Sequence, residues 1–416
     1  MRILLSMMIA MELMPLPAGQ PDWTPTKDAT KGKGLEAIGR SFEVFQHETK
    51  PDWGYKSPQK DTFIVVHPRT ERKGAPLYVV LHSAGHDVLS CAKCTAEVGN
   101  HDIYRSPDDF YALYLDCSAN RGDWWWGGMH LKDEALIRKN SGGDPTPVER
   151  RVIDTVKWVI KTYAIDPNRV YLCGNSMGGS GTLGIGMRHG DVFAAIKANV
   201  PAGIEHVSHR MYFPPKTVPT SLKIPDPPVA VDYSAPNDSW SAGHERFVQA
   251  MNDRKYALYF YWGPFGHANN SEAILRLNDL INSFDWLNVR KNEAYAVFTN
   301  ASDNSRLPWP DSPNEKAPGQ VNAFFLWKNI SDEKDKFEVS LFLRSPADLK
   351  TTFHIPEEST ADVSLRRIQN FHTEPGESIR WTFGAGNGVI KSDPEGVLTI
   401  PGLKLASTPT VLTLRR

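Results

Sequence analysis

The pattern of hydrophobic and polar residues divides the chain into two regions. In the first region, residues 40–70 alternate between polar and apolar and predict antiparallel strands. The residues that follow contain continuous apolar runs, which are typical of parallel strands buried on both faces. These runs cover residues 76–81, 111–115, 170–173, 228–233 and 257–261.

Helical periodicity is strongest between residues 146 and 163. Thr146 is followed by Pro147 and Glu149, which together indicate a helix start with a capping box. Apolar residues then recur at every fourth position, and a second amphipathic pattern covers residues 271–289. Strands alternating with helices predict an α/β architecture with a largely parallel sheet.

The second region begins near residue 291. Short β-rich runs separated by turn residues replace the helical periodicity, which predicts a β-sandwich. Because 416 residues exceed the roughly 250–300 that usually share one core, we expect two domains, an α/β domain over 31–290 and an accessory β-sandwich over 291–416. Residues 1–30 are expected to include a leader, since one positive charge followed by an apolar run resembles a secretory signal. Glu12 interrupts that run.

The charge balance and the cysteine content exclude several classes of function. The chain has 47 basic and 48 acidic residues without a long run of either sign, so electrostatics give no support for nucleic-acid binding. After the N-terminus, no stretch approaches the roughly 18 apolar residues of a membrane span. Four cysteines do not make a disulfide scaffold in a chain this long, and Cys91 and Cys94 have no second pair for a structural zinc site.

The segment Gly174-Asn175-Ser176-Met177-Gly178 carries the clearest chemical signal. It follows an apolar run and precedes a stretch of small residues, which is the strand, sharp turn and helix that a G-x-S-x-G nucleophile elbow requires. Such a turn exposes the serine hydroxyl at the carboxyl end of the strand. We therefore predict that Ser176 is a nucleophile. The alternative is a glycine-rich packing turn with an ordinary serine.

A serine hydroxyl needs a histidine to accept its proton, and an acid to orient that histidine. His267 lies in a glycine-rich loop between the last apolar run and the 271–289 helix, so we predict that it is the base. His244 is the rival, but the apolar periodicity after it indicates the start of a solvated helix.

The acid is expected between the serine and the histidine in chain order. Asp238 lies in the turn after the 228–233 run, whereas Asp232 lies inside that run, where an unpaired carboxylate is costly. We predict that Asp238 is the acid, and Asp232 is the alternative. A capping or turn role is the non-catalytic interpretation of Asp238.

Two backbone donors are expected to stabilise the oxyanion. One is the N–H of Met177, directly after the nucleophile, and the other comes from the loop after the 76–81 strand. Small residues in that loop allow a close approach, so Ser83 or Ala84 is predicted to be the second donor. His82 is expected to support the loop.

Five of the 12 tryptophans fall near the predicted catalytic loops. Trp124, Trp125 and Trp126 follow an apolar strand, and Trp240 and Trp262 flank the predicted acid and base. We predict that they form a substrate surface for a sugar ring or an aromatic acyl group. Packing of the loops onto the core is the alternative.

These motifs resemble those of the secreted esterases related to polyhydroxybutyrate depolymerases, a group that includes feruloyl and acetylxylan esterases. The resemblance covers about residues 60–290 and rests on the segments Leu81–Gly85, Tyr163–Tyr171, Gly174–Gly179 and Gly263–His267. It implies an α/β-hydrolase fold and hydrolysis of feruloyl or acetyl esters on plant polysaccharides, without a metal or a cofactor. Ser83 replaces the usual glycine of the oxyanion loop, and the region from 291 is not part of the family's core.

The leading prediction is therefore a serine esterase, secreted or periplasmic, whose α/β-hydrolase catalytic domain covers residues 31–290. Its partner is expected to be a small or polysaccharide-linked ester, with no nucleic acid and no membrane. A serine peptidase or polyesterase on the same triad is the enzymatic alternative, and a non-catalytic carbohydrate-binding protein is the third. The region 291–416 is expected to contribute little to the chemistry, so that its deletion spares activity on small esters.

Overall fold

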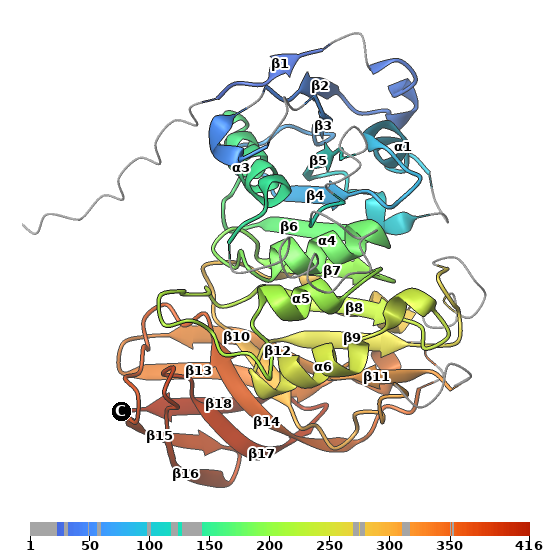
Figure 1. Ribbon diagram of the computed structural model, residues 1–416. Coiled ribbons are helices and arrows are strands. Elements are labelled where there is room, and N and C mark those ends of the chain that lie inside the picture. Colours follow the sequence, from blue (N-terminus) through green and yellow to red (C-terminus); the bar gives the residue numbers. More distant parts are fainter. Residues whose placement is uncertain are drawn as a thin grey trace, which may run out of the picture.

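Figure 1 shows a long central sheet with helices on its faces, and further antiparallel strands at one end of the molecule. Most of the predicted leader lies outside the residues that this computed structural model describes, and the predicted 271–289 helix lies partly outside them. The described residues are 23–28, 32–48, 50–55, 60–97, 101–117, 124–126, 144–268, 274, 279–309, 317–349, 351 and 353–416.

The central sheet has ten strands in the order β1-β2-β3-β5-β4-β6-β7-β8-β9-β11. The six strands from β5 to β9 in this order are parallel, and the antiparallel strands lie at the two edges. This order and these directions are those of an α/β-hydrolase sheet, and each predicted apolar run is a buried strand. The bounds are β1 Thr26–Lys27, β2 Phe42–Gln46, β3 Thr62–Val66, β4 Leu77–Leu81, β5 Tyr111–Leu115, β6 Val170–Asn175, β7 Ala195–Asn199, β8 Val229–Ser234, β9 Leu258–Trp262 and β11 Gly319–Val321.

The helices lie on the faces of this sheet (Figure 1). The capping box predicted for α3 is confirmed, since Thr146 Oγ1 accepts from the Glu149 N–H and the Glu149 carboxylate accepts from the Thr146 N–H, each at 3.3 Å. The α-helices are α1 Val88–Lys93, α3 Pro147–Thr162, α4 Met177–Gly186, α5 Glu205–Arg210 and α6 His244–Asp253. The 3₁₀ helices are η2 Glu36–Ile38, η3 Pro51–Trp53, η4 Asp102–Tyr104, η5 Ser239–Ser241, η6 Trp286–Asn288 and η7 Pro346–Asp348.

The C-terminal region forms two further antiparallel sheets, with the orders β10-β14-β17 and β12-β13-β18-β15-β16. Buried side chains from both sheets, such as Val363 and Leu341, belong to one hydrophobic core. That core also contains Tyr259 and Tyr261 of β9, so it is continuous with one face of the central sheet. The bounds are β10 Tyr295–Thr299, β12 Phe325–Asp332, β13 Lys336–Leu343, β14 Glu358–Arg366, β15 Ser378–Phe383, β16 Gly386–Lys391, β17 Thr399–Ala406 and β18 Thr410–Arg415.

The region from 291 onward also supplies an edge strand to the central sheet. The short strand β11 pairs antiparallel with β9, and Gly319 lies opposite Trp262. A Cβ at Gly319 would lie 1.9 Å from Trp262 Cζ2, so the indole occupies the space that the glycine leaves free. Residues 291–416 are therefore not wholly separate from the α/β region. A strand of three residues without its own apolar alternation gives no signal in the sequence.

Candidate active site

Ser176 lies in the sharp turn between β6 and α4. Its φ of 55° and ψ of −117° fall outside the conformations that residues other than glycine ordinarily adopt. Its N–H donates to the Asn199 carbonyl at 2.9 Å, and its own carbonyl accepts from the Ala202 N–H at 3.1 Å. The end of β7 therefore holds both sides of the strained residue.

The two glycines of the motif allow the turn to pack. A Cβ on Gly174 would lie 2.3 Å from the Gly178 carbonyl carbon, and a Cβ on Gly178 would lie 1.9 Å from the Leu81 oxygen. The helix α4 thus begins in direct contact with the carboxyl end of β4. The G-x-S-x-G spacing is a packing requirement here, and it brings the serine beside the loop that follows β4.

Replacing Gly178 by alanine is expected to lower the free energy of unfolding by about 3 kcal/mol or more. The new Cβ would meet Leu81 O and Leu81 C at 1.9 and 2.7 Å, and backbone atoms cannot rotate away as a side chain can. Thermal melting and ester turnover would both fall. Gly376→Ala is the matched control, since it has a φ of 80° but no neighbour within 4 Å, and it should cost only about 1 kcal/mol. A wild-type melting temperature for Gly178→Ala would contradict the close contact.

Three side chains from separate loops meet at the turn. Ser176 Oγ lies 2.7 Å from His267 Nε2, and His267 Nδ1 lies 2.6 Å from Asp238 Oδ2. The His267 side chain is 33% exposed, whereas that of Asp238 is 1% exposed, so the histidine faces solvent and the carboxylate lies beneath it. The structure thus brings together the three residues that the sequence predicted, in the geometry of a Ser-His-Asp triad.

Hydrogen bonds fix the loop that carries Asp238. Its Oδ1 accepts from the Trp240 N–H at 2.9 Å, so Asp238 caps η5 while Oδ2 faces His267. Asn237 Oδ1 accepts from the Gly266 N–H at 2.9 Å and ties the aspartate loop to the histidine loop. The capping and catalytic interpretations of Asp238 are therefore compatible, because each uses a different oxygen.

Asp232 and His244, the two alternatives for acid and base, pair with each other. Both side chains are fully buried, and Asp232 Oδ2 lies 3.3 Å from His244 Nε2. Burial raises the pKa of the Asp232 carboxyl, and His244 acts in the opposite direction. His244 Nδ1 donates to the Ser241 carbonyl at 2.7 Å, which places the pair behind the Asp238 loop. The predicted helix does start at His244, but the expectation that this residue is solvated is wrong, since aromatic rings cover its imidazole.

One of these rings is Trp309, from the C-terminal region. It stacks on His244 with a centroid distance of 5.6 Å and an interplanar angle of 25°, and its Nε1 donates to Ser241 Oγ at 3.0 Å. Ser241 Oγ in turn donates to the Asp238 carbonyl at 2.8 Å. The expectation that residues 291–416 contribute little to the site therefore does not fit the structure. Trp309 and β11 both contact the α/β region, so deletion of residues 291–416 is expected to lower activity on small esters.

Trp309→Phe is expected to lower kcat by about threefold to tenfold, with little change in KM for a small ester. Phenylalanine keeps a ring against His244 but cannot donate to Ser241 Oγ, so the Asp238 loop is held less firmly. Steady-state kinetics measure the change. Trp381→Phe on β15 is the matched control and should leave kcat unaltered. Equal kcat values for Trp309→Phe and the wild type would show that the contact does not position the acid.

One hydrogen bond in the loop after β4 decides between Ser83 and Ala84 as the second oxyanion donor. The Ser83 N–H donates to Tyr104 Oη at 2.9 Å, so it is already engaged, and Ala84 is the candidate that remains. Ala84 is exposed on the loop that follows β4. Met177 is the first residue of α4, where a backbone N–H has no carbonyl one turn earlier to bond. We therefore predict that the N–H groups of Met177 and Ala84 are the two oxyanion donors.

Buried side chains support this loop from beneath. His82 Nε2 lies 3.0 Å from Asp116 Oδ1, and the Trp125 Nε1–H donates to the His82 carbonyl at 2.9 Å. The supporting role expected of His82 agrees with these contacts. Sequence reasoning missed Tyr104 and Asn237 as positioning residues. The adjacency of Asn237 to Asp238 was a usable signal, whereas nothing local marks Tyr104.

Three of the five predicted substrate-binding tryptophans are packed inside the protein. Trp125, Trp126 and Trp262 are 0%, 4% and 2% exposed. Trp126 stacks on His206 at 4.5 Å, and Trp262 contacts Trp309 at 6.1 Å. Their burial contradicts the predicted contact with substrate, because a side chain without exposed surface cannot touch a ligand. These indoles pack in the core, where their large apolar area is removed from water. Trp240 is 44% exposed and Trp124 is partly buried, so these two of the five present surface.

The described residues contain no cluster of side chains suited to a metal ion. Within these ranges, no group of three or more histidine, cysteine or acidic side chains is arranged to hold a metal ion. All four cysteines are buried free thiols.

Among the residues that the structure describes, no helix combines the length and the apolar character needed to cross a bilayer.

One segment of the sequence matches a known family. Residues 150–205 match the Prolyl oligopeptidase family. The matched segment runs from α3 through β6 and Ser176 to the start of α5, and it leaves Asp238 and His267 outside. No curated protein matches the sequence.

Solved structures with a similar fold are serine hydrolases. The fluorophosphonate-binding serine hydrolase F of Staphylococcus aureus is 13% identical, with a TM-score of 0.41 over 60% of this chain and 99% of that chain. A thermostable esterase is 21% identical, with a TM-score of 0.40 over 55% and 56%. The ferulic acid esterase of Anaeromyces mucronatus is 15% identical, with a TM-score of 0.35 over 56% and 85%.

At such identities and TM-scores, these structures do not assign an activity. The class of protein is instead given by features of this chain: its strand order, its strained serine turn and its Ser-His-Asp geometry. Together these features define an α/β-hydrolase of the serine hydrolase class.

Proposed function

We propose that the protein is a serine carboxylic-ester hydrolase that forms an acyl-enzyme on Ser176. The observation that carries this proposal is the pair of short contacts, 2.7 Å from Ser176 Oγ to His267 Nε2 and 2.6 Å from His267 Nδ1 to Asp238 Oδ2. A serine held in a strained turn, a partly exposed histidine and a buried carboxylate are the parts that acyl transfer requires.

Acylation follows directly from this geometry. Ser176 Oγ attacks the ester carbonyl carbon while its proton passes to His267 Nε2, and the carbonyl electron pair moves to oxygen. The N–H groups of Met177 and Ala84 stabilise that oxyanion. When the oxyanion collapses, the bond to the alcohol breaks and His267 gives its proton to the leaving oxygen. Asp238 stays ionised and orients the imidazole.

Deacylation repeats these steps with water as the nucleophile. His267 Nε2 takes a proton from water, and the hydroxide oxygen attacks the acyl carbon. The second oxyanion collapses, the acid leaves, and Ser176 Oγ regains its proton. This chemistry uses only groups of the chain and water.

We assign the substrate to ester decorations of plant polysaccharides, of the feruloyl or acetyl type. The motif resemblance to feruloyl and acetylxylan esterases supports this class. Trp240 supports it physically, because its 44% exposed indole lies two residues from Asp238 and offers a flat apolar face to a sugar or an aromatic acyl group. A secreted or periplasmic location fits such a substrate and the apolar N-terminus.

A serine peptidase on the same triad is the second candidate. The match of residues 150–205 to the Prolyl oligopeptidase family favours it, since the matched segment includes the nucleophile. A polyesterase would use the same groups. A non-catalytic carbohydrate-binding protein is disfavoured, because binding alone does not require the three side chains to meet within hydrogen-bond distance.

A substrate panel separates these candidates. The wild-type protein should hydrolyse aryl acetates and either methyl ferulate or acetylated xylan, with little activity on peptide substrates. Ser176→Ala provides the blank for every substrate. Faster cleavage of peptides than of esters would show that the protein is a serine peptidase and not an esterase. Activity of the Ser176→Ala variant equal to that of the wild type would exclude both.

A further inference from the structure

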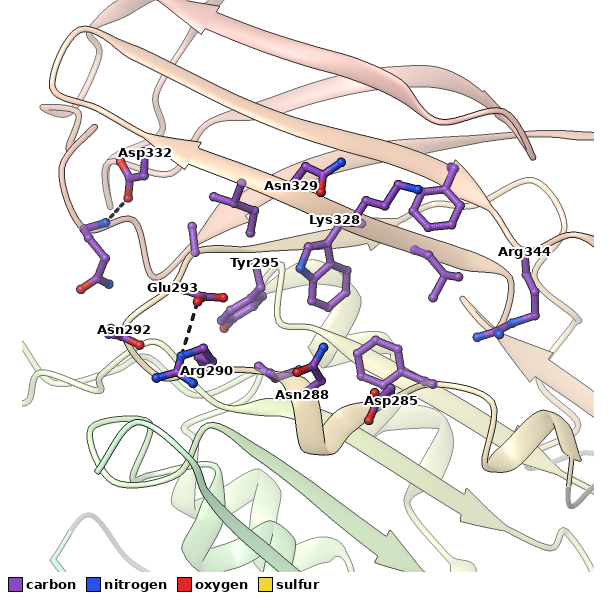
Figure 2. A pocket seen from close by; sticks show the side chains of 18 of the residues that line it. Asp285, Asn288, Arg290, Asn292, Glu293, Tyr295, Lys328, Asn329, Asp332 and Arg344 are labelled. Carbon is purple, nitrogen blue, oxygen red and sulfur yellow. Dashed lines mark hydrogen bonds and ion pairs between the residues drawn. The ribbon is translucent and has the colours of Figure 1, made fainter. Parts of the chain in front are cut away.

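A groove lies between the α/β region and the C-terminal sheets, away from Ser176. It has a volume of about 620 Å³ and is lined by residues 283–295 on one side and by β12 and β13 on the other. In Figure 2, Asn329 and Lys328 lie on the β12 side, Asp285 and Asn288 lie on the facing side, and Arg344 and Asp332 mark the two ends. The volume is within the range of small-molecule sites, about 300–1,000 Å³.

The contacts of residues 290 and 291 place this side of the groove near the amino-terminal end of β6. The triad lies at the opposite, carboxyl-terminal end of that strand. Arg290 pairs with Asp166 at 3.0 Å, and the Lys291 N–H donates to the Asn168 carbonyl at 2.9 Å. Both partners precede β6, whereas Ser176 follows it. The six residues of β6 span about 20 Å. A molecule in the groove is therefore not the ester under attack.

Trp327 gives the groove a fixed aromatic surface. The residue is partly exposed, and its ring packs on Phe284 with a centroid distance of 5.5 Å and lies 6.5 Å from Tyr295. Because neighbouring rings hold the indole, it can receive a ligand without first being ordered. A flat apolar face of this kind suits the C–H face of a sugar ring.

The charged groups around Trp327 balance. Three acidic and three basic side chains line the groove, so it carries no net formal charge. Most of them are already engaged: Arg290 pairs with Asp166 and Glu293, Lys328 Nζ lies over the Phe342 ring, and Asp332 accepts backbone N–H groups of residues 369–371. A groove without excess charge disfavours a strongly anionic or cationic ligand.

Arg344 is a nearly buried charged residue of the groove whose hydrogen bonding is incomplete. It is 8% exposed, and one terminal nitrogen donates to the Ser283 carbonyl at 2.9 Å. Its buried Nε has no hydrogen-bond partner among the described residues. A nearly buried guanidinium that is not fully bonded favours a ligand rich in oxygen acceptors. Five amide side chains line the same groove and can bond hydroxyl groups as donors or acceptors.

We propose that this groove binds a neutral saccharide chain, with a pyranose ring on Trp327 and hydroxyl oxygens facing Arg344 and the amide side chains. The choice of a xylan-type saccharide rests on the proposed function. A site at this position holds the polymer while the triad acts on an ester elsewhere along the substrate. It also gives the C-terminal sheets a role in substrate capture.

Binding is measured by titration calorimetry of neutral xylo-oligosaccharides into the full-length Ser176→Ala protein, which removes hydrolysis. We expect saturable binding, weakened at least about tenfold by Trp327→Ala and unchanged by Trp381→Ala on β15. Because Trp327 also packs on Phe284, Asn288→Ala provides a second variant at an exposed position and should weaken binding severalfold.

Absence of saccharide binding by the full-length protein would overturn the inference, as would equal affinities for the Trp327→Ala, Asn288→Ala and unsubstituted proteins. Tighter binding of polygalacturonate than of neutral xylo-oligosaccharides would contradict the charge argument. Hydrolysis of a small aryl ester by the wild-type protein reports on Ser176 alone. Failure of the groove and failure of the proposed esterase are therefore distinguishable.

Discussion

Ser176→Ala is expected to lower ester turnover by about three to six orders of magnitude while the melting temperature changes little. The hydroxyl oxygen is the atom that forms the acyl bond, and it lies 2.7 Å from His267 Nε2, which takes its proton. Stability should be nearly unaltered because the strained conformation of Ser176 is fixed by backbone bonds to Asn199 and Ala202, which alanine keeps. Initial rates on an aryl ester and a thermal melt measure the two quantities.

Ser378→Ala is the control for this substitution. Ser378 is exposed on β15, so the loss of its hydroxyl should alter neither turnover nor melting. If Ser176→Ala kept more than about a tenth of the wild-type turnover, a mechanism through an acyl-serine would be wrong.

Asp238→Asn is expected to lower kcat by about 10³-fold to 10⁴-fold. The amide cannot stabilise the imidazolium that forms when His267 takes the serine proton, and its NH₂ group cannot accept from Nδ1–H. The cap on η5 should survive, since asparagine keeps an oxygen that can accept from the Trp240 N–H. Steady-state kinetics over a range of pH check the loss.

Asp232→Asn is the matched comparison. It makes the same chemical change at a residue within β8, whereas Asp238 lies in the loop that follows this strand. Because Asp232 contacts His244 rather than His267, its replacement should affect stability more than kcat. A larger loss of kcat for Asp232→Asn than for Asp238→Asn would reverse the assignment of the acid.

The nucleophile and its partners were accessible to sequence reasoning because their signals are local. Gly174, Ser176 and Gly178 lie within one turn, and that turn needs small residues wherever it occurs. His267 and Asp238 could be found because the ends of parallel strands meet at one edge of the sheet, so the loop after each strand is a restricted search space. Strand periodicity supplied that frame, and the structure has a strand at each of the five continuous apolar runs of the first region.

Contacts between distant segments were not accessible in this way. Trp309 donates a hydrogen bond to Ser241, which lies 68 residues earlier in the sequence. The strand β11 pairs with β9 although its own sequence has no apolar alternation. The hydrogen bond from Ser83 to Tyr104 depends on the placement of η4, which no motif specifies. The predicted contact of Trp125 and Trp126 with substrate failed for a related reason, since a consecutive aromatic triplet gives no information on which face each ring takes.

Covalent labelling tests the central claim most directly. The protein is incubated with an aryl or alkyl fluorophosphonate, digested, and mapped by mass spectrometry, with Ser176→Ala and Ser378→Ala treated in parallel. We expect one phosphonyl adduct, on the peptide that contains Ser176, which appears as ester hydrolysis is lost and is absent from Ser176→Ala. Inactivation with the adduct on another residue, or an unlabelled Ser176 in a protein that hydrolyses esters, would contradict the account.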